Sequence, residues 1–99
     1  MKILLTGAGG QLGRVLAQPL KQMGEVSAPN RTALDLADGK TLKDALEAIQ
    51  PALIVNAAAY TEVDQAQTET RQAYLVNAAA PEIMARWAAT RGVPLVHFS

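Results

Sequence analysis

Residues 1–13 read MKILLTGAGGQLG, a short apolar run followed at once by closely spaced glycines. Apolar residues then recur at helical spacing as far as Gly24, at Leu12, Val15, Leu16, Leu20 and Met23. This change of period predicts a strand over Ile3–Leu5, a tight turn and an amphipathic helix. A strand, a glycine turn and a helix form the first half of a βαβ unit.

The rest of the chain repeats this alternation of short apolar runs and helical spacing. Further strands are expected at Val26–Ala28, Ala33–Leu36, Leu53–Val55 and Pro94–Phe98. Helices are expected from Asp38 or Thr41 to Pro51, and from about Thr70 to Arg91, where Gly92 ends the helix. Strands separated by helices pair in parallel, so we predict a doubly wound, Rossmann-like α/β fold with strand order 3-2-1-4-5. Its last strand would be an unpaired edge, so we expect a truncated domain from a longer protein.

Composition narrows the class of protein. The 99 residues carry nine basic and nine acidic side chains, one His and no Cys, and 49% are apolar. This describes one small domain without the basic surface that nucleic acids or anionic membranes require. The absence of cysteine excludes disulfides and thiolate sites, and we expect no structural metal. With no signal peptide or membrane span in these residues, a cytoplasmic location is expected.

The glycine turn carries the first functional signal. Gly7, Gly10 and Gly13 lie three apart, in a G-x-x-G-x-x-G pattern that differs from G-x-G-x-x-G because Leu12 occupies the last glycine position. Gly7 would permit the turn, Gly10 would let the backbone approach a pyrophosphate, and Gly13 would allow close packing of the helix. Free amides at the helix start would hold the phosphates, so we predict dinucleotide binding. The alternative is a glycine-rich turn that binds nothing.

The residues after the second strand bear on the choice of cofactor. An acid there would accept the ribose 2′-hydroxyl and repel a 2′-phosphate, but the chain has Asn30 and Arg31. Because guanidinium matches phosphate geometry, NADP is favoured over NAD. Arg31 as an ordinary surface charge remains the alternative. Asp35, about twenty residues past Gly13, could be taken as the ribose acid but fits better at the end of the third strand.

The stretch from Val55 to Ala66, VNAAAYTEVDQA, resembles the extended short-chain dehydrogenase/reductase family and, within it, the dTDP-4-dehydrorhamnose reductases. The resemblance covers the whole chain, and the segment from Asn56 to Ala66 is its most specific part. Other matching positions, in the family's order, are the glycine turn with Gln11 and Leu12, Asp35-Leu36, Pro51, Val63-Asp64, Asn77 and Val96–Ser99.

The resemblance implies hydride transfer from NADPH, or from NADH, to the 4-keto group of a dTDP-linked deoxysugar, giving dTDP-L-rhamnose. It also implies cofactor contacts, from Gly10, Gln11 and Leu12 to the pyrophosphate and from Asp35 and Leu36 to the adenine. Ala57, Ala58, Ala59, Tyr60 and Thr61 would lie on the ribose and nicotinamide side. Small residues suit a cofactor that lies across the strand ends, although close helix packing would also favour alanines.

Members of this family reduce the carbonyl with a Ser or Thr, a Tyr, and a Lys four residues after the Tyr. Tyr60 is followed four residues on by Asp64, and Tyr74 by Ala78, so neither fits. Ser99 matches the residue just before the catalytic Ser or Thr. We therefore expect no catalytic residue within residues 1–99 and no reductase activity from them alone.

Four more residues merit an interpretation. Asn77 matches a helix asparagine that supports a water-mediated proton path in such dehydrogenases. Pro81 cannot donate to the Asn77 carbonyl, which we hypothesise binds a water; a plain proline kink is the alternative. His97 fits a packed or edge position better than a base, and Trp87 fits a helix-to-sheet core.

Two other functions remain open at this stage. One is a non-catalytic regulatory subunit that keeps the dinucleotide fold, which a missing Tyr-x-x-x-Lys downstream would favour. The other is a sugar-nucleotide epimerase or dehydratase with tightly held NAD, which Asn30-Arg31 and Asn56 disfavour. The substrate pocket would belong to a C-terminal region beyond residue 99, and the oligomeric state, including a homodimer, stays open.

Overall fold

The computed structural model describes residues 1–30, 32–58 and 70–98. The strands in chain order are β1 (Lys2–Thr6), β2 (Glu25–Ser27), β3 (Leu53–Asn56) and β4 (Leu95–His97). The helices are α1 (Gln11–Met23), α2 (Gly39–Ile49), α4 (Thr70–Tyr74), the π-helical segment η1 (Leu75–Ala79) and α5 (Ala80–Arg91).

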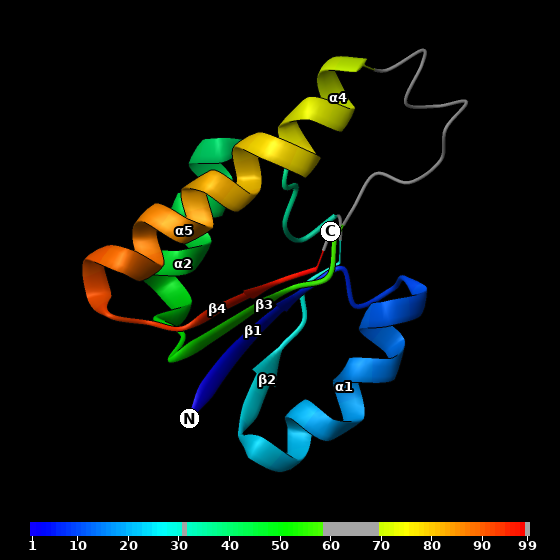
Figure 1. Cartoon of the computed structure of the whole chain (residues 1–99), viewed down its shortest axis with the longest axis vertical. Coiled ribbons are helices and arrows are strands. Elements are labelled where there is room, and N and C mark those ends of the chain that lie inside the picture. The colour runs from blue at the N-terminus through cyan, green and yellow to red at the C-terminus, as the bar shows by residue number, and fades with distance from the viewer. Residues whose placement is uncertain (31, 59–69, 99) are drawn as a thin grey trace.

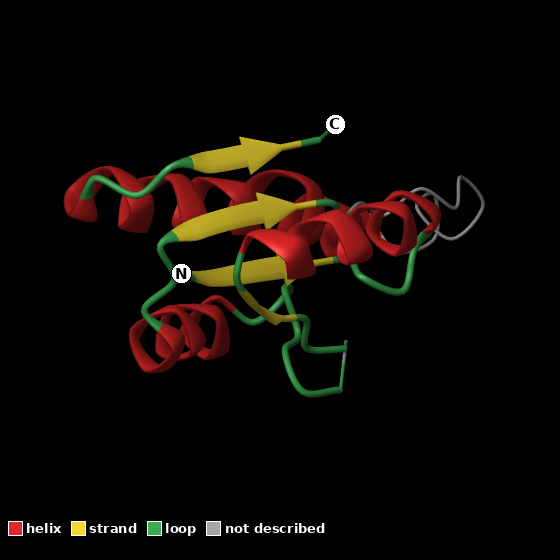
Figure 2. Ribbon diagram, turned by 90° about the horizontal axis from the view of Figure 1, so that it is seen from below, coloured by secondary structure: helices red, strands yellow, loops and turns green. Residues whose placement is uncertain are grey.

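The strands form one parallel sheet in the order β2-β1-β3-β4. Helix α1 lies on one side of it, and α2, α4 and α5 lie on the other (Figure 1). Figure 2 shows the strands pointing the same way. This confirms the predicted doubly wound α/β fold, with β1 at the centre of the sheet.

The two faces of the sheet hold separate apolar clusters, because alternate residues of a strand point to opposite faces. Leu4 of β1 and Ile54 of β3 face α2 and α5, whereas Leu5 and Val55 face α1. Burial on both faces explains why β1 and β3 read as continuous apolar runs. The larger cluster includes Trp87, which confirms the expected helix-to-sheet position of this side chain.

The predicted strand over Ala33–Leu36 was wrong, so the sheet has four strands among the described residues rather than five. Two short polar side chains hold the backbone here in turns. Asn30 Oδ1 accepts a hydrogen bond from the Ala33 amide, and Asp35 Oδ1 accepts one from the Ala37 amide, both at 2.9 Å. Such local bonds compete with strand pairing. The remaining strands keep the expected relative order.

The helix expected from Thr70 to Arg91 contains a π-helical turn at Leu75–Ala79, where the Ala80 amide donates to the Leu75 carbonyl. Proline at position 81 lacks an amide and cannot donate to the Asn77 carbonyl four residues earlier. A change of hydrogen-bond register just before Pro81 is consistent with that missing donor. It places the proline at the start of α5, where no amide is needed.

The starts and ends of α2 and α5 follow local chemistry. Of the two candidates for the start of α2, the structure selects Asp38, whose side chain accepts from the amides of Lys40 and Thr41. The helix ends at Gln50, which adopts a left-handed conformation with φ of 51°. Helix α5 ends at Gly92 with φ of 65°, as the sequence predicts.

Candidate functional site

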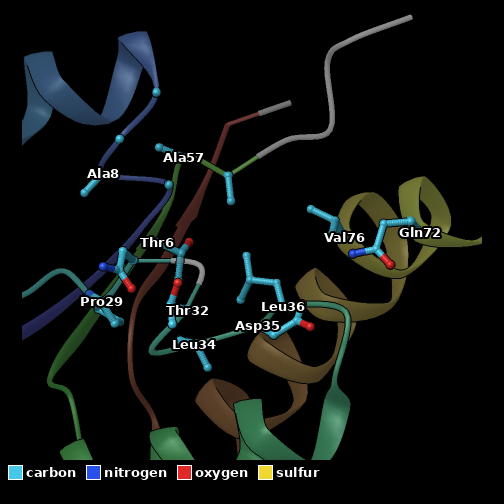
Figure 3. Close-up of a pocket in the computed structure, with 15 residues that line it drawn as sticks. Thr6, Ala8, Pro29, Thr32, Leu34, Asp35, Leu36, Ala57, Gln72 and Val76 are labelled. Atoms are coloured by element: carbon cyan, nitrogen blue, oxygen red, sulfur yellow. The ribbon is translucent and has the colours of Figure 1, made fainter. Parts of the chain in front are cut away.

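A cavity of about 630 Å³ opens at the carboxyl ends of the strands. Its walls come from the glycine turn after β1, the loop after β2, the start of the loop after β3, and the helix α4–η1. In Figure 3, Thr6 and Ala57 lie on one side of the cavity, Gln72 and Val76 on the other, with Leu36 between them. The chain crosses from β2 past β1 to β3, so this is the point where strand order reverses and ligands bind in such sheets.

Two glycines of the turn are required by its packing. Gly7 has φ of +77°, and a Cβ there would lie 2.6 Å from Ala58 Cα. A Cβ on Gly13 would lie 2.6 Å from Ala8 Cα, so the first turn of α1 packs directly on the glycine turn. Gly10 differs, because its Cβ would lie an ordinary 3.5 Å from the Gly7 carbonyl oxygen. The fold therefore requires glycine at positions 7 and 13 but not at position 10.

The start of α1 is left without a cap. Gly10 occupies the N-cap position and has no side chain to accept a hydrogen bond, and no acidic residue lies in the first turn. The first helical hydrogen bond runs from the Arg14 amide to the Gly10 carbonyl at 3.0 Å. The preceding amides of residues 11–13 are thus the orphan donors of the helix, beside the cavity. An anion is the natural acceptor for such donors.

A row of polar side chains crosses three strands at the same edge. Thr6 Oγ1 donates to Asn56 Oδ1 at 2.5 Å, and Asn56 Nδ2 lies 2.9 Å from His97 Nδ1. Asn56 Oδ1 also accepts from the Ala58 amide at 3.2 Å, which ties the loop after β3 to the sheet. Sequence reasoning missed this row; the one available signal was that Thr6 and Asn56 are the polar residues that end two buried strands.

The cavity brings together half of the residues predicted to bind a cofactor. Those that line it are Gly7, Gly10, Asn30, Asp35, Leu36, Ala57 and Ala58. Gln11, Leu12 and Gly13 do not line it but form the adjoining first turn of α1. Arg31, Ala59, Tyr60 and Thr61 lie outside the described residues.

Eight lining residues were not predicted. They are Thr6, Ala8, Gly9, Pro29, Thr32, Leu34, Gln72 and Val76. Most of them are chain neighbours of predicted residues, so the segments that line the cavity are longer than the sequence predicts. Gln72 and Val76 come from a segment that the sequence predicts only as part of a long helix, and no local signal connects them to the glycine turn.

Two other predicted features have a place in the structure. His97 lies on the edge strand β4 with its Nδ1 on Asn56, consistent with the expected edge position. Asn77 lies in the π-helical segment, and its water-binding role stays a prediction.

Within residues 1–30, 32–58 and 70–98, no helix is long and apolar enough to cross a membrane. The same ranges hold no group of three or more His, Asp or Glu placed to bind a metal ion.

Comparison with known proteins places the chain in a family. The family model described as the RmlD substrate binding domain matches residues 1–99. The chain belongs to this family. Among curated relatives, it is 40% identical over 99 residues to the spore coat polysaccharide biosynthesis protein SpsK of Bacillus subtilis. It is 41% identical over 99 residues to a dTDP-4-dehydrorhamnose reductase of Burkholderia thailandensis.

These matches cover nearly all of this chain but only 35% and 33% of the two relatives. The chain therefore spans about a third of the length of the curated relatives it matches. Among solved structures, a dTDP-4-dehydrorhamnose reductase of Bacillus anthracis in complex with NADP has a TM-score of 0.82 and 32% identity. That match covers 95% of this chain and 34% of the reductase chain, so the two share the Rossmann-like fold over this region.

Proposed function

We propose that residues 1–99 are the cofactor-binding part of an NADP-dependent reductase of the RmlD family. The full-length protein would reduce the 4-keto group of a dTDP-linked deoxysugar to give dTDP-L-rhamnose. The observation that carries the proposal is the uncapped start of α1, which adjoins the cavity at the glycine turn. The related structure that holds NADP supports the choice of cofactor. Although the family description names a substrate-binding domain, the features of this segment favour a cofactor site.

The cavity has features that fit a dinucleotide. Its volume lies within the usual range for cofactor sites of roughly 300–1,000 Å³. Gln11, Leu12 and Gly13 would offer backbone amides to the pyrophosphate, and Ala57 and Ala58 leave room beside the strand ends. Recognition of the 2′-phosphate is assigned to Arg31 on sequence grounds alone, because this residue lies outside the described part of the chain.

When bound, NADPH supplies the hydride for the reduction. The residues described here bind and orient the cofactor, and the Ser or Thr, Tyr and Lys that the family uses for proton transfer would lie beyond residue 99. We assign Asn77 to a supporting role in the proton path, through an ordered water near the π-helical turn. The hydrogen bonds from Thr6 and from the Ala58 amide to Asn56 would hold the loop after β3 in place at the cavity wall.

The seat for the pyrophosphate can be tested with two matched substitutions. Gly10→Ala and Gly9→Ala each add one methyl group, and neither Cβ meets a close protein atom. The methyl group of Gly10→Ala would hold the pyrophosphate away from the amides of residues 11–13. Because a lost hydrogen bond to a charged group contributes roughly 1.5–3 kcal/mol, NADPH binding should weaken about tenfold or more. Gly9→Ala should weaken it less. Calorimetric titration measures both affinities, and thermal melting of the unliganded proteins checks that each variant folds.

Equal affinities of the two variants and the unchanged protein would contradict the pyrophosphate assignment. The reaction itself is tested by adding NADPH and the dTDP-4-dehydro sugar to the full-length protein and following the loss of NADPH absorbance. Binding of NADPH without turnover would support a regulatory subunit over a reductase. Release of tightly held NAD on denaturation would instead support an epimerase or dehydratase.

A further inference from the structure

The fold already uses several of the polar side chains that line the cavity. Thr6 donates to Asn56, Asn30 accepts from the Ala33 amide, and Asp35 accepts from the Ala37 amide. Gln72 also lines the cavity, but its amide forms no hydrogen bond with the described residues of the chain. It is half-buried, so its amide lies at the cavity wall and not in open solvent. A half-buried amide without a partner among the described residues is available to a ligand.

Gln72 and Val76 are four residues apart on one helix, so they share a face. Both line the cavity, and Figure 3 shows them side by side on the wall opposite Thr6 and Ala57. Leu36, from the loop after β2, lies between these walls in the same view. Leu36 and Val76 offer apolar surfaces to a flat ring, while the Gln72 amide can both donate and accept a hydrogen bond at the ring's edge.

The direction of the cofactor follows from the topology. In a doubly wound sheet, the residues after the second strand contact the ribose of the adenosine half. Leu36 follows β2 and lines the cavity, so this part of the cavity lies on the adenosine side of the glycine turn. The pocket between Leu36 and Val76 is therefore placed for the base and not for the nicotinamide.

We propose that Gln72 recognises the adenine base, with its side-chain oxygen accepting a hydrogen bond from the 6-amino group. This inference rests on the proposed function, because it presumes that the cavity holds an adenine dinucleotide. A glutamine amide matches the adjacent donor and acceptor on an edge of adenine. Gln72 is thus a residue that selects the base, distinct from those that hold the phosphates.

The test is a binding cycle with two ligands. One ligand is NADP⁺, and the other is its analogue in which hydrogen replaces the 6-amino group of adenine. The unchanged protein should bind NADP⁺ about 3- to 10-fold more tightly than the analogue, the effect of one neutral hydrogen bond. Gln72→Leu, which keeps similar bulk without hydrogen bonding, should show a clearly smaller ratio of the two affinities, although Asp35 still lines the same cavity. Calorimetric titration measures the affinities without requiring turnover.

Two further variants sharpen the result. Gln72→Glu keeps an acceptor for the 6-amino group and should keep the preference for NADP⁺. Gln18→Leu changes an exposed glutamine of α1 and should leave the preference unchanged. If the unchanged protein and Gln72→Leu show the same ratio of affinities while both bind NADP⁺, the assignment of Gln72 is wrong and the cofactor site stands. Failure of the unchanged protein to bind NADP⁺ would overturn both proposals.

Discussion

Asn56 is a buried polar side chain that links Thr6 of β1 to His97 of β4 at the carboxyl end of the sheet. It is 1% exposed, and its amide meets a partner on each side. Because the Ala58 amide can only donate, the atom that accepts from it must be the oxygen Oδ1. The nitrogen Nδ2 then faces His97 and donates to Nδ1, which places the ring proton of neutral His97 on Nε2. One amide thus sets both the loop after β3 and the tautomer of His97.

Removing this amide should destabilise the protein. Asn56→Leu keeps similar volume but leaves the buried Thr6 hydroxyl and the Ala58 amide without their acceptor. We expect a loss of about 1–3 kcal/mol in the free energy of unfolding, measured by urea denaturation. Thr6→Val removes one donor and leaves Asn56 bonded to Ala58, so its cost should be smaller. A stability of Asn56→Leu equal to that of the unchanged protein would show that the row contributes nothing.

At the scale of elements, the N-termini of α1 and α2 differ in their capping. Helix α2 has its first amides satisfied by Asp38, whereas α1 begins at Gly10 with no side-chain cap. The hydrogen bonds from the Thr41 hydroxyl and amide, with that from the Lys40 amide and the Lys40 charge, hold the pKa of Asp38 below its usual range. The amides at the start of α2 are therefore satisfied by a side chain, whereas those at the start of α1, beside the cavity, are left for a ligand.

The Asp38 cap should make stability depend on pH. Because folding lowers the pKa of this carboxyl, its contribution is present above the usual aspartate range near pH 4 and is lost as the pH falls through the lowered value. Asn caps helices about as well as Asp but does not titrate. Asp38→Asn should therefore match the unchanged protein at pH 7 and lose less of its melting temperature toward pH 3.

The matched variant Asp38→Ala removes the cap at every pH. Its melting temperature should be lower than that of the unchanged protein already at pH 7, since the amides of Lys40 and Thr41 lose their acceptor. Parallel thermal melts of the three proteins between pH 3 and pH 7 separate the two effects. Identical pH profiles for Asp38→Asn and the unchanged protein would contradict the argument.

At the scale of the whole molecule, the larger apolar core lies between the sheet and the helices α2 and α5. Leu46 of α2 is fully buried there, in the same cluster as Met84 and Trp87 of α5. Glu47 adds a bond across the pair, because it accepts from Trp87 Nε1 at 3.0 Å and from Arg91. Helix α1 covers the other face, and its Val15 is 70% exposed.

Two truncations compare these sites. Leu46→Ala should lower the free energy of unfolding by about 2–5 kcal/mol, because it leaves a cavity in the core. Val15→Ala should change it by less than about 0.5 kcal/mol, because the side chain is mostly in water. Urea denaturation measures both. Similar losses for the two variants would mean that the exposed side of α1 is packed in the folded protein.

Much of this molecule is determined by short stretches of sequence. The glycine turn, the alternation of strand and helix, and the stop at Gly92 were all predictable, because backbone conformation and apolar period depend on neighbouring residues. The same local reasoning failed at Ala33–Leu36, where Asn30 and Asp35 hold turns that an apolar pattern does not reveal.

Contacts between residues far apart in the sequence could not be predicted from local patterns. Thr6, Asn56 and His97 form one row because parallel pairing of β1, β3 and β4 sets them side by side. Gln72 reaches the cavity because α4 continues through η1 into α5, which packs on the sheet. Within its own segment, none of these side chains indicates which distant residue it will meet. Their roles arise when folding brings together segments tens of residues apart, and no local pattern records that pairing.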